Sequence, residues 1–155
     1  AAKGNPGPSG WCWWAGPECW AAGGWPTATN NIAELTAVGA ALAALQGDLN
    51  TNVTIVTDSK YVINSMTKYI HGWKRNGWRT TKGDNVANSA YIKRIDELIR
   101  ARNATLNWEW VKGHTGVYGN THADAGASQA AEAFAGRGTL RTGPGWTGTL
   151  PQLPS

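Results

Sequence analysis

A run of β-branched residues, Val53 to Thr57, is the feature that most limits how this chain can fold. Continuous apolar and β-branched runs of this length are typical of strands buried on both faces, which occur where helices cover a sheet. On both sides of the run, from Ile32 to Leu45 and from Val62 to Trp73, apolar residues recur at intervals of three and four, as on one face of a helix. The pattern therefore predicts an α/β fold.

The remaining segments extend this pattern. From Trp11 to Trp25, aromatic and small residues alternate around a Gly16-Pro17 turn, which predicts an antiparallel hairpin. Helical spacing returns from about Asn88 to Arg102 and from Asn120 to about Phe134, and Leu106 to Trp110 alternates as a strand. We expect a mixed sheet flanked by helices in one domain, residues 1–135. Residues 136–155 are rich in Gly, Pro and Thr, which predicts a tail or linker.

Composition excludes two classes of protein. With 41% hydrophobic and 15% charged residues the chain is too apolar for a disordered protein, yet no apolar run approaches the roughly 18 residues of a membrane helix, so no membrane partner is expected. The first nine residues lack the pattern of a secretory signal, which favours the cytoplasm. Cys12 and Cys19 are then expected to be free thiols.

Three carboxylates lie in unusual positions. Glu34 lies in the first turn of a predicted helix, Asp58 follows the β-branched strand, and Asp124 lies in an alanine-rich helix. Taken singly, Glu34 could favour the helix dipole and Asp58 could cap the next helix. Taken together near one sheet edge, they would repel one another unless hard cations such as Mg²⁺ balanced their charge.

Motifs along most of the chain resemble one known family. Five segments carry the resemblance: Gly4 to Pro8, Thr29 to Leu35, Thr57 to Val62, Trp108 to His114, and Asn120 to Asp124. In this order they are similar to type 1 ribonuclease H of the bacterial type, from about Gly4 to Phe134. The resemblance implies a mixed five-stranded sheet flanked by helices.

The resemblance also implies an activity. Type 1 ribonucleases H are endonucleases that hydrolyse the RNA strand of RNA–DNA hybrids, leaving 3′-hydroxyl and 5′-phosphate ends. Glu34, Asp58 and Asp124 match three of the four carboxylates that hold two Mg²⁺ ions there, with Mn²⁺ as an alternative ion. His114 matches a loop histidine that assists proton transfer or product release. The expected partner is a hybrid duplex, bound by a monomer.

The family's first carboxylate has no counterpart in this chain. Its place is five residues before Gly4, which would precede Ala1, on the strand at the centre of the family's sheet. Without that strand we expect two half-sheets with open edges. Three interpretations stay open: a fragment of an intact enzyme, a catalytically incomplete module that binds hybrids, or a nuclease domain cut from a larger polypeptide.

Polar residues beside the carboxylates match the family's nucleic-acid contacts. Asn5, Asn30 and Asn31 correspond to positions that touch the minor groove of the hybrid, where short amides can reach the 2′-hydroxyl. Thr29 and Asn88 correspond to a pocket for a phosphate of the DNA strand. Each of these residues also has a structural interpretation, as a turn residue or a helix cap.

A basic segment completes the predicted interface. No Asp or Glu lies between Ser59 and Gly83, and within this segment cations alternate with aromatic residues. It resembles the protruding basic handle of bacterial members, and five of its residues are expected to bind nucleic acid: Trp73, Lys74, Arg75, Trp78 and Arg79. Binding through phosphates should weaken steeply with added salt and depend little on sequence.

Overall fold

The computed structural model describes residues 1–113 and 118–146. The strands are β1 (Gly7–Gly16), β2 (Cys19–Ala28), β3 (Val53–Thr57) and β4 (Leu106–Trp110). The helices are α1 (Asn30–Ala44), α2 (Lys60–Asn64), α3 (Ile70–Arg75), α4 (Ser89–Arg100) and α5 (Tyr118–Phe134), and a π-helical turn, η1 (Ser65–Tyr69), joins α2 to α3. The predicted order of elements is therefore confirmed.

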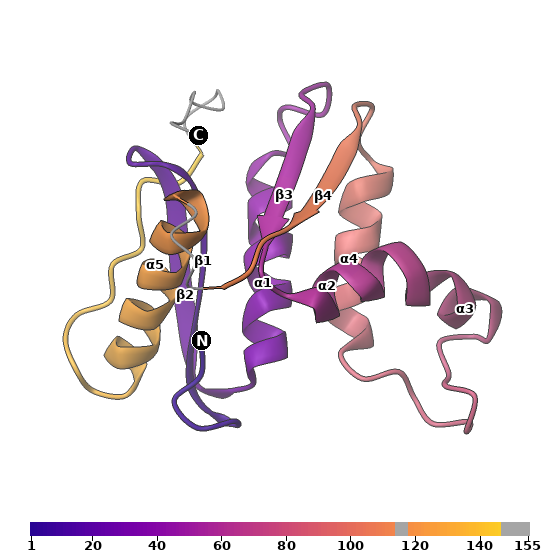
Figure 1. Ribbon diagram of the computed structural model, residues 1–155, viewed down its shortest axis with the longest axis horizontal. Coiled ribbons are helices and arrows are strands. Elements are labelled where there is room, and N and C mark those ends of the chain that lie inside the picture. The colour runs from indigo at the N-terminus through magenta and orange to yellow at the C-terminus, as the bar shows by residue number, and fades with distance from the viewer. Residues whose placement is uncertain (114–117, 147–155) are drawn as a thin grey trace.

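The strands form two separate pairs (Figure 1). β1 and β2 are antiparallel, with Cys12 opposite Ala22, and β3 and β4 are parallel, with Ile55 opposite Trp108. Within residues 1–113 and 118–146 no strand connects the two pairs. This is the arrangement of two half-sheets that the sequence predicts when the central strand of the sheet is lacking.

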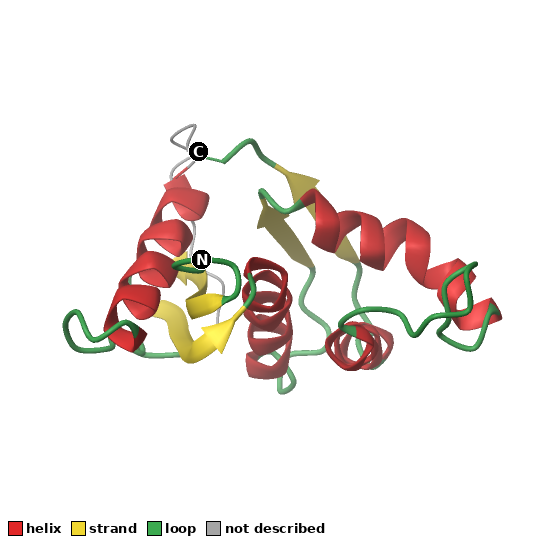
Figure 2. Cartoon of the chain, turned by 90° about the horizontal axis from the view of Figure 1, so that it is seen from below, coloured by secondary structure: helices red, strands yellow, loops and turns green. Residues whose placement is uncertain are grey.

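Helix α5 packs closely on the hairpin, which lies between α5 and α1 (Figure 2). Small residues make this possible. A Cβ on Gly10 of β1 would lie 2.1 Å from the carbonyl oxygen of Ala127, and one on Gly126 of α5 would lie 2.5 Å from Cys12 Sγ. Backbone therefore approaches backbone, which explains why the buried side of α5 includes residues as small as Ala130.

The main hydrophobic core lies between α1, α4 and the helical stretch from α2 to α3. Its members share apolar side chains at helical spacing: Leu35, Val38, Leu42, Val62, Met66, Ile70, Ile92, Ile95 and Leu98. From the strand side, Ile55 and Trp108 pack against this core. The amphipathic helices thus cover one face of β3 and β4, and this packing holds the end of β3 in place.

The start of α1 differs from the prediction that Asn30 or Asn31 caps a helix beginning at Ile32. The N-cap is Thr29, whose extended backbone lets its Oγ1 accept a hydrogen bond from the N–H of Ile32 at 3.2 Å. The helix begins at Asn30, so Glu34 lies in its second turn rather than its first. Because the dipole effect fades beyond the first turn, it does not account for Glu34.

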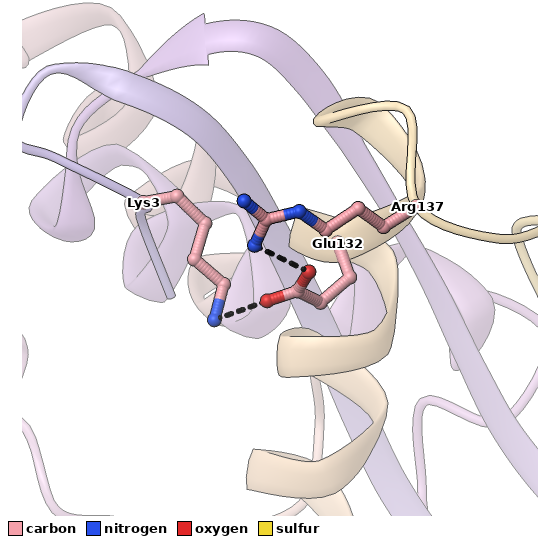
Figure 3. Close-up of polar contacts among 3 residues, drawn as sticks. All are labelled: Lys3, Glu132 and Arg137. Atoms are coloured by element: carbon pink, nitrogen blue, oxygen red, sulfur yellow. Dashed lines mark hydrogen bonds and ion pairs between the residues drawn. The ribbon is translucent and has the colours of Figure 1, made fainter.

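Polar contacts hold the two ends of the described chain against α5 and the hairpin. Glu132 pairs with Lys3 at 2.6 Å and with Arg137 at 3.2 Å (Figure 3). Further along, the N–H of Ala22 donates to the carbonyl oxygen of Thr142 at 3.1 Å. Residues 137–146 form no helix or strand but are docked on the protein, and treating 136–155 as a separate tail remains a prediction.

Two further expectations bear on the compartment. Cys12 and Cys19 are free, as predicted, and the structure buries both. Burial, together with the charge of Asp124, raises the pKa of the Cys12 thiol to about 12. In the part of the chain that the structure describes, no helix combines the length and apolar character needed to cross a membrane.

Candidate active site

Asp58 directly follows β3, at the carboxyl end of the parallel strand pair. It is not the cap of the next helix, because Ser59 takes that role: Ser59 Oγ accepts a hydrogen bond from the N–H of Val62 at 3.2 Å. The Asp58 carboxylate is thus left available for another task. Ligands commonly bind at the carboxyl ends of strands in α/β folds.

Glu34 on α1 and Asp124 on α5 line the same groove as Asp58, a cavity of about 520 Å³. One wall is formed by residues 10–15 of β1 and the opposite wall by residues 52–58, which include β3. The three predicted carboxylates therefore line one cavity, and their role as metal ligands remains a prediction.

The charges of these carboxylates act on one another. The pKa of Glu34 is raised to about 7, first by burial, then by the negative charge of Asp58 and less by that of Asp124. Excess negative charge in a partly buried groove favours a bound cation.

Two neighbours of the carboxylates were missed by sequence reasoning. The buried Asn120 donates from Nδ2 to Asp124 Oδ2 at 3.4 Å, one helical turn away on α5. Gly113 leaves no room for a side chain beside Asp58, as a Cβ would lie 2.8 Å from Asp58 Oδ2. The i, i+4 spacing of Asn120 and Asp124 in a helix could have revealed their hydrogen bond. The approach of Gly113 to Asp58 depends on the path of the loop after β4, which has no local sequence signal.

The donor set fits a hard divalent cation, since it consists of carboxylate and amide oxygens, the ligands that Mg²⁺ prefers. The described side chains do not form a closed cluster, however: nowhere in residues 1–113 and 118–146 do three Asp, Glu, His or Cys groups lie close enough together to hold a metal ion. The groove is lined by the three carboxylates, but in the described residues they lie too far apart to hold a metal ion together.

The groove lies between an edge of β1 and an edge of β3. Beside β1, the nitrogen of Ala1 donates to the carbonyl oxygen of Gly10 at 2.8 Å, and the N–H of Gly10 donates to the carbonyl oxygen of Ala1 at 2.8 Å. With an antiparallel bridge between Ala2 and Ser9, this pair begins a strand on the edge of β1 that borders the groove.

Comparisons with known proteins agree with this geometry. The family model described as RNase H matches residues 1–132. A protein named Ribonuclease H from Tropheryma whipplei (strain Twist) is 48% identical over 143 residues, covering 92% of this chain and 87% of that relative. A protein of the same name from Polaromonas sp. is 45% identical over 140 residues, covering 88% and 87%.

The chain belongs to the ribonuclease H family. Among solved structures, LC9-RNase H1, a type 1 RNase H with the type 2 active-site motif, superposes with a TM-score of 0.66 at 28% identity over 81% of this chain. The match spans 56% of that solved chain. RNase H1 from Halobacterium salinarum superposes with a TM-score of 0.61 at 28% identity, covering 86% and 92% of the two chains.

The predicted substrate contacts of this ribonuclease H gather around the start of α1. Asn5 Oδ1 accepts a hydrogen bond from the N–H of Asn30 at 3.1 Å, while Asn30 and Asn31 are exposed. Across the molecule, Asn88 adopts a left-handed backbone and donates to Tyr61 Oη at 3.0 Å. Thr29 caps α1, so its structural role is established, and its contact with phosphate remains a prediction, as does that of Asn88.

In the handle, residues 70–79, two tryptophan rings contact each other and basic side chains lie around them. Trp73 contacts Trp78 with ring centroids 6.3 Å apart, and Lys93 of α4 lies 5.0 Å above the Trp78 ring, a cation that sequence reasoning missed. Lys74 pairs with Asp96 at 2.9 Å. Arg75 and Arg79 are exposed. The cations of the handle therefore differ in how fully their charge is available to a ligand.

The predicted catalytic histidine, His114, lies outside the described residues. His122, two residues before Asp124, stacks on Trp14 of β1 with centroids 4.4 Å apart and rings 10° from parallel. Its ring is therefore engaged with the hairpin.

Proposed function

We propose that this chain is the nuclease domain of a ribonuclease H that hydrolyses the RNA strand of RNA–DNA hybrids and leaves 3′-hydroxyl and 5′-phosphate ends. The observation that carries the proposal is the position of Glu34, Asp58 and Asp124 on one groove of a chain in this family. A solved relative of the same fold, a foamy viral protease–reverse transcriptase, is described in complex with an RNA/DNA hybrid.

Two Mg²⁺ ions are the proposed cofactors, with Mn²⁺ as an alternative, and the three carboxylates would hold them. Bound ions of this kind supply a nucleophilic hydroxide and stabilise charge on the phosphate and the leaving oxygen. The chain's own residues position the reaction. Asn120 orients the Asp124 carboxylate, Asn5 links the first loop to α1 beside Glu34, and His114 is proposed to move a proton near neutral pH.

The fourth carboxylate is proposed to come from a strand in the groove. Residues preceding Ala1 would continue the antiparallel pairing of Ala1 with Gly10 along β1 and pass beside β3. A strand there would satisfy both open edges at once and join the two pairs into one sheet.

The alternative function is hybrid binding without cleavage. It is favoured by the lack of a closed metal cluster among the described side chains. In this case the handle and the asparagines would still bind the duplex, while the three carboxylates would hold metal too weakly for turnover.

A cleavage assay separates the two functions. The chain is incubated with end-labelled hybrid and Mg²⁺, beside Asp58→Asn and a control, Glu97→Gln, which removes an exposed carboxylate of α4. In a chain extended by the family's first strand, which supplies the fourth carboxylate, the nuclease proposal expects cuts in the RNA strand alone, lost in Asp58→Asn and kept in Glu97→Gln, with hybrid binding retained throughout. Binding without cuts in the extended chain would establish the alternative.

We also propose a cytoplasmic location and a monomeric state. Two buried free thiols suit a reducing compartment. Gel filtration with light scattering tests the monomeric state, since a dimeric species would contradict it. Localisation of the tagged protein in cells tests the compartment, since export from the cytoplasm would contradict it.

A further inference from the structure

The edge of β2 that faces away from β1 is covered by residues 139–146, which follow α5 and are drawn in yellow in Figure 1. The N–H of Ala22 donates to the carbonyl oxygen of Thr142 at 3.1 Å, and the N–H of Gly145 donates to that of Trp20 at 2.9 Å. In the part of the chain that the structure describes, β1 is the only strand paired with β2. This segment therefore satisfies backbone groups on an edge that would otherwise be open.

Side-chain contacts fix the path of this segment. Gln129 of α5 uses both ends of its amide: Nε2 donates to the carbonyl oxygen of Thr139 at 2.6 Å, and Oε1 accepts a hydrogen bond from the N–H of Arg141 at 3.0 Å. Gly143 then passes directly over Trp20 with a left-handed φ of +77°, and a Cβ there would lie 2.7 Å from the Trp20 ring. The path therefore depends on specific residues in the segment and in the domain beneath it.

Trp146 connects the segment to the other half of the molecule. Its Nε1 donates to Asp48 Oδ2 at 2.6 Å, and Asp48 belongs to the loop between α1 and β3. The half-buried ring lines the groove together with Asn52 and Val53, where β3 begins. The contact therefore lies at the end of β3 that is opposite Asp58.

A single contact of this kind is strong enough to decide whether a segment is docked. A hydrogen bond to a carboxylate is roughly twice as strong as one between neutral groups. The other contacts of residues 139–146 are hydrogen bonds near the surface, which open locally at little cost. In the described residues no strand joins the two strand pairs, so the hydrogen bond from Trp146 to Asp48 is one of the contacts that connect their halves.

We propose that residues 139–146 form a strap that fastens the hairpin half of the molecule to the half that carries β3, and that the hydrogen bond between Trp146 and Asp48 is its latch. This inference goes beyond the proposed function and does not depend on catalysis. When the latch opens, the strap leaves β2 and exposes the backbone groups of Trp20 and Ala22 together with one end of the groove. The strap is thus a part of the domain that opens and closes without unfolding of the core.

Limited digestion with dilute trypsin measures how often the strap is open, because Arg141 lies within it and the bond that follows can be cut only in the detached form. Mass spectrometry follows this cut under native conditions. Asp48→Ala is expected to raise its rate about tenfold, the worth of one hydrogen bond to a charged group. Asp48→Asn keeps an acceptor oxygen and should stay within about threefold of the parent chain. The matched control, Asp84→Ala, removes an exposed carboxylate from another loop and should leave the rate unchanged.

A second variant tests whether Trp146 and Asp48 act through one contact. Trp146→Phe keeps an aromatic ring but loses the N–H, and should raise the rate of the cut after Arg141 to a similar extent as Asp48→Ala. The double variant should be cut no faster than the faster single variant, since both changes remove the same hydrogen bond.

Cleavage after Arg94 distinguishes opening of the strap from unfolding of the domain. Arg94 lies within α4, between the buried Ile92 and Ile95, so its rate should be equally slow in every variant. The proposal would be overturned by a cut after Arg141 that is as fast in the parent chain as in a short peptide of the same sequence, or that is unchanged by Asp48→Ala. Effects that multiply in the double variant, or an equal rise after Arg94, would also overturn it.

Discussion

Gly113 lies directly against Asp58: a Cβ at position 113 would be 2.8 Å from Asp58 Oδ2. The clash involves the end of a side chain rather than backbone, so an alanine there should displace the carboxylate while leaving the fold intact. The loop after β4 thereby controls where a proposed metal ligand can lie.

Gly113→Ala is therefore expected to lower kcat of hybrid cleavage at least tenfold, because small displacements of a reacting site are costly, and to leave the melting temperature nearly unchanged. Steady-state kinetics at saturating Mg²⁺ and thermal unfolding measure the two effects. As a control, Gly47→Ala changes a glycine with open space around it and should leave kcat unaltered. A Gly113→Ala variant with full activity would show that the position of Asp58 does not limit the reaction.

Glu34 should make stability depend on pH. Its pKa is raised to about 7 by burial and by the charge of Asp58, so between its unfolded and folded pKa values the native state binds more protons than the unfolded state. Without divalent ion, its contribution is present at about pH 5 and is lost as the pH rises through about 7. The free energy of unfolding of the parent chain should fall by roughly 1–3 kcal/mol from this residue alone.

Urea unfolding of the parent chain and of Glu34→Gln, at about pH 5 and about pH 8, measures this contribution as the difference between the two pH dependences. Glu34→Gln should show the flatter dependence in that interval. Added Mg²⁺ should stabilise the parent chain more at the higher pH, where Glu34 is ionised. Identical pH dependences would show that Glu34 does not carry the raised pKa.

Sequence alone predicted these carboxylates because their positions follow from periodicity and strand ends. The β-branched run locates Asp58, and Ser59 beside it is a strong helix cap. By contrast, Thr29 and Asn30 are both good caps, and backbone geometry decided between them. Lys60 over Trp110 links residues far apart in the sequence, and residues 137–146 are docked by hydrogen bonds to distant residues, such as Ala22 and Asp48. Neither leaves a local signal in the chain.

Arg102 is expected to be a major contributor to stability. Its buried guanidinium donates to the carbonyl oxygens of Leu45, Asp48 and Thr51, where the end of α1 turns toward β3. Arg102→Ala would leave these acceptors without partners and should cost about 3 kcal/mol. Arg100→Ala removes an exposed cation two residues earlier in the sequence. It is the control and should cost less than about 1 kcal/mol. Chemical denaturation measures the free energy of unfolding of both variants. Equally small losses in Arg102→Ala and Arg100→Ala would show that Arg102 is not a major contributor to stability.

Within the handle, the arginines should contribute more to hybrid binding than Lys74. Lys74 is paired with Asp96, which also pairs with Arg100 at 3.0 Å. Among the described residues no ion pair includes Arg75 or Arg79, although Arg79 Nη1 donates to the carbonyl oxygen of Gly83 at 3.1 Å. The double variant Arg75→Gln, Arg79→Gln should reduce the salt slope of binding by about two, and Lys74→Gln by less than one. A larger effect from Lys74→Gln would mean that its ion pair opens when nucleic acid binds.

The central claim is that Glu34, Asp58 and Asp124 together hold divalent ions. Crystals of the chain soaked in Mn²⁺, with diffraction data that record the anomalous signal of manganese, test it most directly. We expect anomalous peaks in the groove between β1 and β3, within coordination distance of carboxylate oxygens from all three residues. Peaks confined to other parts of the surface, or a groove without metal at saturating Mn²⁺, would contradict the account.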